Sequence, residues 1–304
     1  MEPWSARGAE EAFIVPPALE PGARIAIVAP SSPFDRALLL RGVGWLGERY
    51  RVEFDWRACE REGFLAGSDQ RRLEELDRAL ERDDLAAIVA ARGGYGLTRV
   101  VHRAHFAALR RAPKWLVGFS DVTALHLEAL TQRVASIHAE NAAGLGRGDA
   151  RARGEWIRVL ENPRETRTVR GLGCLRGGAA RGVLAGGNLT LLFTQAAAGR
   201  LRLPDGAVLV IEDVTEAAYR VDRMLTALLV AGALDRVGAV VVGDFSECPP
   251  SRGVSVEQVL AERLSELRVP VLTGLGFGHG ERNLPLVFGA PASVDGAAGT
   301  LTLG

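Results

Sequence analysis

Short apolar runs alternate with amphipathic segments along the first half of the chain. The run RIAIVA ends in Pro30 and two serines, which is typical of a buried strand followed by a loop. The segment SDQRRLEELDRALER has leucines at helical spacing, and Ser68 is placed to cap its first turn. The pattern predicts strands at 24–29, 50–56, 85–91 and 115–117, and helices at 38–49 and 68–82.

This alternation favours βαβ units, so we expect an α/β fold with a parallel sheet. In such a sheet the carboxyl ends of the strands share one edge, and ligands bind there. The loops RGGYG at 92–96 and GFSD at 118–121 each follow a predicted strand. We therefore expect these two loops to be neighbours in space.

The chain changes character near residue 162. The stretch 163–180 is rich in Gly and Arg and has little periodicity, which indicates a linker between an N-terminal domain at 1–162 and a C-terminal domain at 181–304. A length of 304 residues is sufficient for two such cores. Beyond the linker the pattern predicts strands at 207–211, 237–242 and 269–272, and helices at 189–198 and 217–231.

Composition and charge exclude several classes of protein. Lys plus Arg and Asp plus Glu each total 37, so no global field favours nucleic acid or an acidic membrane. No apolar stretch approaches the roughly 18 residues of a membrane span, and the N-terminal residues lack the apolar region of a signal peptide. The three cysteines are far apart and form no C-x-x-C pair. We expect a cytoplasmic protein with reduced thiols and without a metal or other cofactor.

Ser120, in the stretch WLVGFSDVTALH, has two interpretations. It can cap the helix that begins there, because its hydroxyl oxygen can accept a hydrogen bond from an unpaired backbone NH. It can also be a nucleophile, because a tight turn between strand and helix resembles the elbow G-x-S-x-G. Gly118 fits that elbow, but Val122 stands where its second glycine belongs. This stretch alone leaves both interpretations open.

Five histidines are candidate bases for Ser120. His102 and His105 fall in a predicted surface helix rich in Arg, where solvated side chains are expected. His126 lies six positions beyond the serine on one helix, which turns it about 240° away and moves it about 9 Å along the axis. It cannot reach the serine.

Two histidines and two carboxylates remain. His138 follows a predicted strand and either lines the site or is structural. His279 lies in GLGFGHG, whose glycines either allow the backbone to approach another surface closely or simply form a turn. Glu212 and Asp213 end the apolar run AVLVI, where a carboxylate is costly, so one of them can orient an imidazole or cap the next segment.

Backbone NH groups near Ser120 could hold an oxyanion. The NH of Asp121 lies in the first turn of the predicted helix, and the glycines of RGGYG could provide a second donor. Glycine-rich loops also bind phosphate, but RGGYG lacks the spacing of a dinucleotide fingerprint and the Lys-Ser/Thr of a P-loop.

Six ordered stretches resemble the LD-carboxypeptidases, the serine peptidase family of muramoyltetrapeptide carboxypeptidase and the microcin C immunity peptidase. The resemblance runs from about residue 20 to the C-terminus, through FLAGSDQRRLEELDRAL, IVAARGGYGLTRVV, VGFSDVTALH, LAGGNLTLL, VLVIEDVTEAAYRVDRMLTAL and PVLTGLGFGHGERNLPLVFG.

The resemblance implies roles for five residues: Ser120 as nucleophile, Glu212 as the acid of the triad, His279 as general base, and the backbone NH groups of Asp121 and Gly94 as oxyanion donors. It also implies an N-terminal α/β domain that carries the serine, a smaller β-rich C-terminal domain that carries Glu and His, and an active site at their interface. Members of the family are commonly homodimers.

The implied reaction is hydrolysis of an amide bond that joins an L-centre to a C-terminal D-amino acid, as in a murein tetrapeptide during peptidoglycan recycling. The alternatives are detoxification of a peptidyl or aminoacyl nucleotide antibiotic by the same triad, and a non-catalytic binding module on the same fold. Candidate substrate contacts are Arg92, Tyr95, His138 and Arg282. The chain departs from the frequent His-Gly-Pro of the family, because His138-Ala139-Glu140 puts an acidic side chain where a small turn is usual. We expect this difference to alter the pocket wall or the substrate preference.

Overall fold

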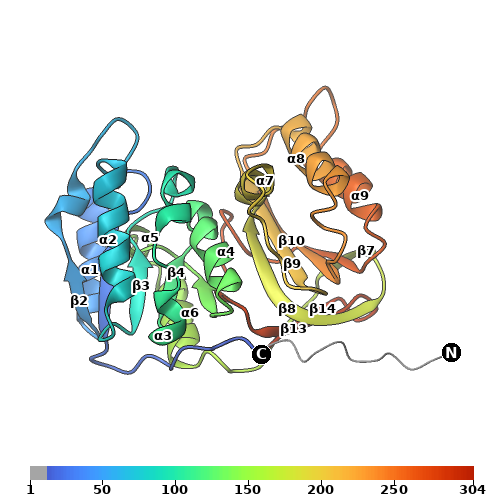
Figure 1. Ribbon diagram of the computed structural model, residues 1–304. Helices are drawn as coiled ribbons and strands as arrows, with labels where there is room; N and C mark the ends of the chain where they lie inside the picture. Colours follow the sequence, from blue (N-terminus) through green and yellow to red (C-terminus); the bar gives the residue numbers. More distant parts are fainter. Residues whose placement is uncertain (1–11) are drawn as a thin grey trace.

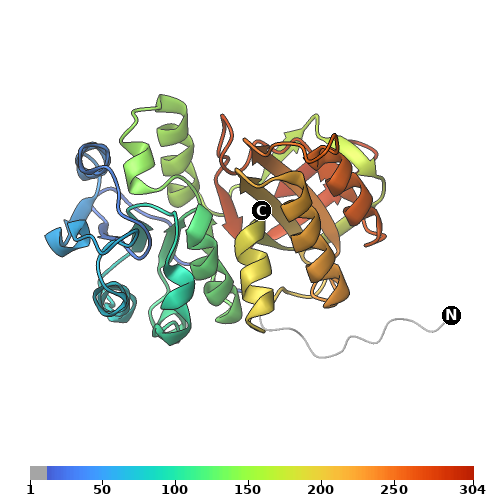
Figure 2. The same ribbon diagram turned by 90° about the horizontal axis from the view of Figure 1, so that it is seen from above.

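The computed structural model describes residues 12–304, so the first eleven residues of the expected N-terminal domain lie outside the described residues. The chain forms two lobes that lie side by side (Figures 1 and 2). The first contains most of the N-terminal half, and the second contains most of the C-terminal half. Among the described residues, no helix has the length and apolar character required to cross a membrane.

The first lobe is built on a six-stranded sheet with helices on both faces (Figures 1 and 2). Its central strands are apolar runs that are buried along their whole length, as expected for parallel strands covered on two sides. The strand order is β12 (Leu286–Phe288), β5 (Ser136–His138), β4 (Trp115–Gly118), β3 (Ala87–Ala90), β1 (Arg24–Val28) and β2 (Arg51–Phe54). All neighbours are parallel except β12, which pairs antiparallel with β5. The expected α/β fold is confirmed.

The helices predicted at 38–49 and 68–82 and after Ser120 are present in this lobe, together with three that were not predicted. Ser68 caps its helix as predicted, since its side chain accepts a hydrogen bond from the NH of Arg71. The helices are α1 (Arg36–Gly47), α2 (Asp69–Glu81), α3 (Ala108–Arg111), α4 (Thr123–Thr131), α5 (Ala142–Leu145) and α6 (Ala150–Glu161).

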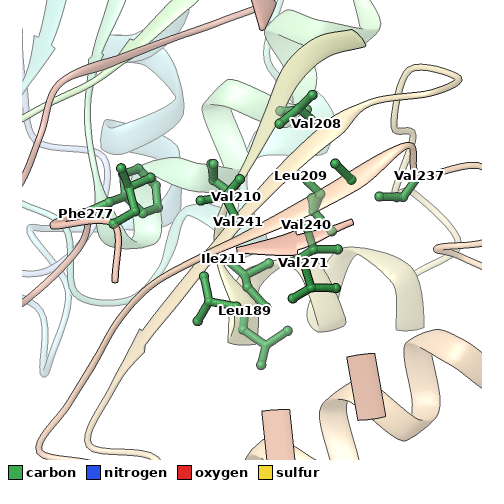
Figure 3. Close-up of a cluster of buried hydrophobic side chains, with 14 of the residues drawn as sticks. Leu189, Val208, Leu209, Val210, Ile211, Val237, Val240, Val241, Val271 and Phe277 are labelled. Carbon is green, nitrogen blue, oxygen red and sulfur yellow. The ribbon is translucent and has the colours of Figure 1, made fainter. Parts of the chain in front are cut away.

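The second lobe is built on an eight-stranded mixed sheet. Its order is β6 (Arg167–Arg170), β14 (Thr300–Leu303), β13 (Pro291–Asp295), β8 (Ala179–Asn188), β9 (Val208–Val214), β10 (Ala239–Ser246), β11 (Val271–Thr273) and β7 (Gly173–Arg176). The four strands from β8 to β11 are parallel to one another. The helices are α7 (Leu189–Ala197), α8 (Ala218–Val230) and α9 (Val256–Ser265). Apolar side chains of β9, β10 and β11 pack with Leu189 of α7 and with Phe277 in the core of the lobe (Figure 3).

The expected linker at 163–180 forms part of this second sheet. It contains β6 and β7, which pair with β14 and β11 at opposite edges of the sheet. Every residue of β7 is exposed. An edge strand that faces solvent needs no apolar alternation, which explains why the Gly- and Arg-rich sequence gave no strand signal.

The two lobes contact each other at the start of α4, directly after the GFSD turn. The NH of Asn188, at the end of β8, donates to the hydroxyl of Thr123 at 3.0 Å. A Cβ on Gly187 would lie 2.5 Å from the same hydroxyl oxygen. Gly187, the second glycine of LAGGN, therefore allows the end of β8 to contact the start of α4, next to Ser120.

Candidate functional site

Ser120 occupies a strained turn between β4 and α4. Its φ is +68°, a left-handed conformation that costs a non-glycine residue about 1–3 kcal/mol. Residues Ser120–Val122 form a short 3-10 turn, and neither this turn nor α4 has a side-chain cap. The cap interpretation is therefore wrong, and Ser120 instead lines a cleft.

The RGGYG loop packs directly against Ser120, as expected for two loops at the same edge of a parallel sheet. A Cβ on Gly93 would lie 2.8 Å from the Cβ of Ser120 and 3.1 Å from its Oγ. On the other side of the loop, the carbonyl of Gly93 accepts from the NH of Ser32 at 3.3 Å. Because the C=O and NH of a trans peptide point in opposite directions, the NH of Gly94 faces away from Ser32.

The adjacent carboxylates at the end of β9 have different partners. Oε2 of Glu212 lies 2.7 Å from Nδ1 of His279. Asp213 instead accepts hydrogen bonds from the side chain of Asn188 and from the NH and hydroxyl of Thr190, at the start of α7. Successive side chains of a strand point to opposite faces, so only Glu212 meets the imidazole.

Glu212 and His279 form a coupled pair. The Glu212 side chain is fully buried, and His279 is partly exposed. Burial lowers the pKa of His279, but the hydrogen bond and the charge of Glu212 outweigh it, so this pKa is raised above its ordinary value. With Nδ1–H donated to a carboxylate, Nε2 is the nitrogen free to accept a proton.

Gly278 explains how the loop brings His279 to Glu212. Its φ is +111°, and a Cβ at this position would lie 2.5 Å from Oε2 of Glu212. A side chain would therefore collide with the carboxylate that His279 must reach. The close approach predicted for the GLGFGHG loop is confirmed.

A cleft of about 520 Å³ brings these groups together. It is lined by Ser120, Arg92 and Gly94 from the first lobe and by His279 from the second. The rings of Phe119 and His279 are 4.9 Å apart, which places the imidazole beside the serine turn. The volume lies within the range of small-molecule sites, about 300–1,000 Å³.

Three predicted substrate contacts do not line this cleft in the described structure. Tyr95 is 49% exposed and packs its ring against Phe64. Arg282 is ion-paired with Glu155 at 2.7 Å. His138 is fully buried. Each of these side chains is directed to another partner or away from the cleft, and their contact with a substrate stays a prediction.

The other histidines behave as their positions predicted. His102 and His105 are exposed, although the helix expected there is only the short 3-10 turn Val101–Arg103, which leaves His105 outside it. His126 is buried between the carbonyl of Gly118 and the hydroxyl of Ser136, each at 2.9 Å. Burial lowers the pKa of His126 to about 4, so this ring is a neutral structural group.

Two asparagines support the site and were missed by sequence reasoning. Oδ1 of Asn283 lies 2.9 Å from Nε2 of His138 and accepts from the NH of Gly278, the residue before His279. Oδ1 of Asn141 accepts from the NH of Phe119, the residue before the serine. Asn141 follows β5, the strand beside β4, so its position at the same sheet edge could have identified it.

The side chain of Asp121 has a role separate from its backbone NH. It is buried, and Oδ2 accepts from the NH of Leu97 at 2.9 Å. This bond connects the serine turn to the residue after RGGYG. Its pKa is raised by burial, which the hydrogen bond to Leu97 opposes.

A serine in a strained turn, an imidazole and a buried carboxylate are the residue types that serine hydrolases combine. Among residues 12–304, no group of three or more His, Cys, Asp or Glu side chains is placed to hold a metal ion. Residues 25–139 match the LD-carboxypeptidase N-terminal domain, and residues 181–294 match the LD-carboxypeptidase C-terminal domain. The chain belongs to the LD-carboxypeptidase family.

Known relatives cover nearly the whole chain. A Streptomyces coelicolor protein named as a carboxypeptidase is 40% identical over 301 residues, with 96% of each chain covered. Murein tetrapeptide carboxypeptidase of Pseudomonas aeruginosa is 33% identical, over 90% of this chain and 93% of the relative.

Solved structures are similar as well. Muramoyltetrapeptide carboxypeptidase from Oxalobacter formigenes superimposes with a TM-score of 0.83 at 31% identity, over 92% of this chain and 97% of that one. The microcin C7 self-immunity protein MccF has a TM-score of 0.86 at 19% identity, over 95% and 98%. The likeness to MccF establishes the shared fold.

Proposed function

We propose that this protein is a serine carboxypeptidase that hydrolyses the amide bond before a C-terminal D-amino acid of a murein tetrapeptide. The observation that carries the proposal is the contact of Glu212 with His279 in the cleft that Ser120 lines. The names of two relatives at 33% and 31% identity, which refer to a murein tetrapeptide and to a muramoyl tetrapeptide, support the substrate class.

The proposed mechanism gives each of the three side chains its own role. Nε2 of His279 accepts the hydroxyl proton of Ser120 while Oγ attacks the scissile carbonyl. Glu212 holds the imidazole in the required tautomer and stabilises the imidazolium. His279 then donates the proton to the leaving amine of the D-amino acid. A water molecule next attacks the acyl-enzyme while Nε2 of His279 accepts its proton. His279 returns this proton to Oγ of Ser120 as the product acid leaves.

Backbone donors complete the proposed site. The NH of Asp121 lies in the first turn after Ser120, and the NH of Gly94 faces away from the Ser32 side of its loop. Each donor of this kind contributes about 3 kcal/mol to the stability of the transition state. Arg92, which lines the cleft, is the proposed partner of the terminal carboxylate.

Mass spectrometry of a murein tetrapeptide incubated with the purified protein tests the proposal. The wild type is expected to release the terminal D-alanine, and Ser120→Ala is expected to release none. The same peptide ending in L-alanine is the substrate control, and it should remain intact. Full turnover by Ser120→Ala would show that the mechanism is wrong.

Labelling with a fluorophosphonate separates this enzyme from a non-catalytic binding module. The wild type should form a covalent adduct at Ser120, and the adduct should disappear in Ser120→Ala. The homodimer implied by the family resemblance and the cytoplasmic location expected from the sequence also belong to this proposal. Sedimentation of the full chain tests the first, and cell fractionation tests the second.

A further inference from the structure

Glu140 places a carboxylate in the wall of the cleft that contains Ser120 and His279. Its backbone is held in position, because its carbonyl accepts from Nε1 of Trp156 at 3.1 Å. Its side chain packs over Gly144 of α5, where any Cβ would overlap the carboxylate. The chain therefore keeps α5 free of a side chain at the point where the acid lies.

This carboxylate has no cation as a direct partner. None of the ion pairs found among residues 12–304 includes Glu140, although the charges of Arg147 and His279 and the side chain of Asn283 stabilise its charged form. Burial outweighs these groups and raises the pKa of Glu140, so a charge at this position remains costly. A positively charged ligand group would offset that cost.

The same cleft also contains positive charge. Arg92 and Arg147 line it together with Glu140. The guanidinium of Arg92 donates to the carbonyl of Pro33, which fixes its position at the start of α1. A cleft that presents both signs of charge suits a ligand that carries both an ammonium and a carboxylate group.

We propose that Glu140 determines specificity by binding an ammonium group on the side chain of the residue that provides the scissile carbonyl. The proposal rests on the proposed function, because it assigns a substrate contact in the same cleft. When the last residue of a tetrapeptide is released, the scissile carbonyl belongs to the third residue, and the N-terminal amine lies two residues earlier. A diamino acid at the third position places a side-chain ammonium next to the carbonyl that Ser120 attacks.

Two tetrapeptides that differ only at the third residue test this proposal. One has lysine there, and the other has norleucine, which keeps the length of the chain and lacks the ammonium. The wild type should favour the lysine peptide by at least about tenfold in kcat/KM, because a site built for a polar group discriminates against an analogue without it. In Glu140→Gln and Glu140→Ala this ratio should fall to near one.

Glu281→Gln is the matched control. Glu281 is an exposed acid on the loop that carries His279 and does not line the cleft, so its removal should leave the wild-type ratio unchanged. Thermal melting confirms that each variant is folded, and Glu140→Ala provides the second measurement if Glu140→Gln does not fold.

The outcomes separate the two proposals. A wild type that cleaves both peptides equally well, or Glu140 variants that keep the ratio, would overturn the role of Glu140 and leave the proposed function standing. A wild type that cleaves neither peptide would overturn both. A ratio that also collapses in Glu281→Gln would mean that general negative charge, and not Glu140, sets the preference.

Discussion

Nδ1 of His279 lies 2.7 Å from Oε2 of Glu212, although 67 positions separate the two residues in the chain. This contact sets a pH dependence. The proposed base must be unprotonated, and Glu212 raises the pKa of His279 above its ordinary value of 6.5. Activity of the wild type should therefore fall as the pH drops through a value above 6.5.

Glu212→Gln should move this acidic limb to lower pH, because the neutral amide no longer stabilises the imidazolium. The maximum of kcat/KM should also fall by about 10²–10⁴, since the imidazole loses its orienting carboxylate. The measurement is kcat/KM against pH. Glu247→Gln, which removes an exposed acid, is the control and should match the wild type. An acidic limb that stays in place in Glu212→Gln would contradict the assigned pair.

Gly93→Ala should reduce activity without unfolding the protein. The new methyl group would lie 2.8 Å from the Cβ of Ser120 and 2.9 Å from the carbonyl of Phe119, so the serine turn must shift. A shift of about 1 Å at a reacting atom costs about 10²-fold in rate. Steady-state kinetics and thermal melting together separate this effect from a loss of folded protein.

Gly44→Ala is the matched control for Gly93→Ala. Gly44 lies within α1, and a Cβ there meets nothing within 4 Å. Alanine should raise the stability by about 0.5–1 kcal/mol, because it is the better helix former. Its activity should equal that of the wild type. Equal activities of the two alanine variants would show that the contact between Gly93 and Ser120 is unimportant.

The fold and the main site residues could be predicted because their signals are local. Apolar runs predicted the strands, and glycine-rich loops at the ends of strands in both sheets marked the side chains that meet at the cleft between the lobes. Ser120, Glu212 and His279 each follow such a run.

The remaining features depend on contacts between distant segments. Arg282 was expected at the substrate, but it pairs with Glu155, 127 positions earlier. The side chain of Asn283 contacts Nε2 of His138, which lies 145 positions earlier in the chain. The edge strand β7 is exposed throughout and therefore has no apolar pattern. Local periodicity contains no information about such partners.

The side chain of Asp121 should contribute to stability separately from its backbone NH. Asp121→Ala would leave the NH of Leu97 without its buried acceptor, which costs about 1–3 kcal/mol. Asp121→Asn retains an oxygen that can accept this bond, and should keep most of the stability. Urea unfolding of both variants measures the difference. Equal destabilisation by alanine and asparagine would mean that the charge, and not the hydrogen bond, is what matters.

Asn283 should position His279 without touching the substrate. Its Oδ1 accepts from the NH of Gly278 at 3.2 Å, and it faces Nε2 of the buried His138 at 2.9 Å. Asn283→Ala removes the hydrogen bond that holds Gly278, the residue before the proposed base. We expect kcat to fall about tenfold with little change in KM, because the general base acts in the transition state and contributes little to ground-state binding.

Asn162→Ala is the control for this variant, since Asn162 is exposed at the end of α6 and does not line the cleft. It should keep the kcat of the wild type. The pH profile adds a readout that a loss of stability would not change. If the contact between His279 and Glu212 loosens in Asn283→Ala, the acidic limb should move toward lower pH, as in Glu212→Gln but by a smaller amount. A lower kcat with an unmoved limb and a lower melting temperature would instead assign Asn283 a purely structural role.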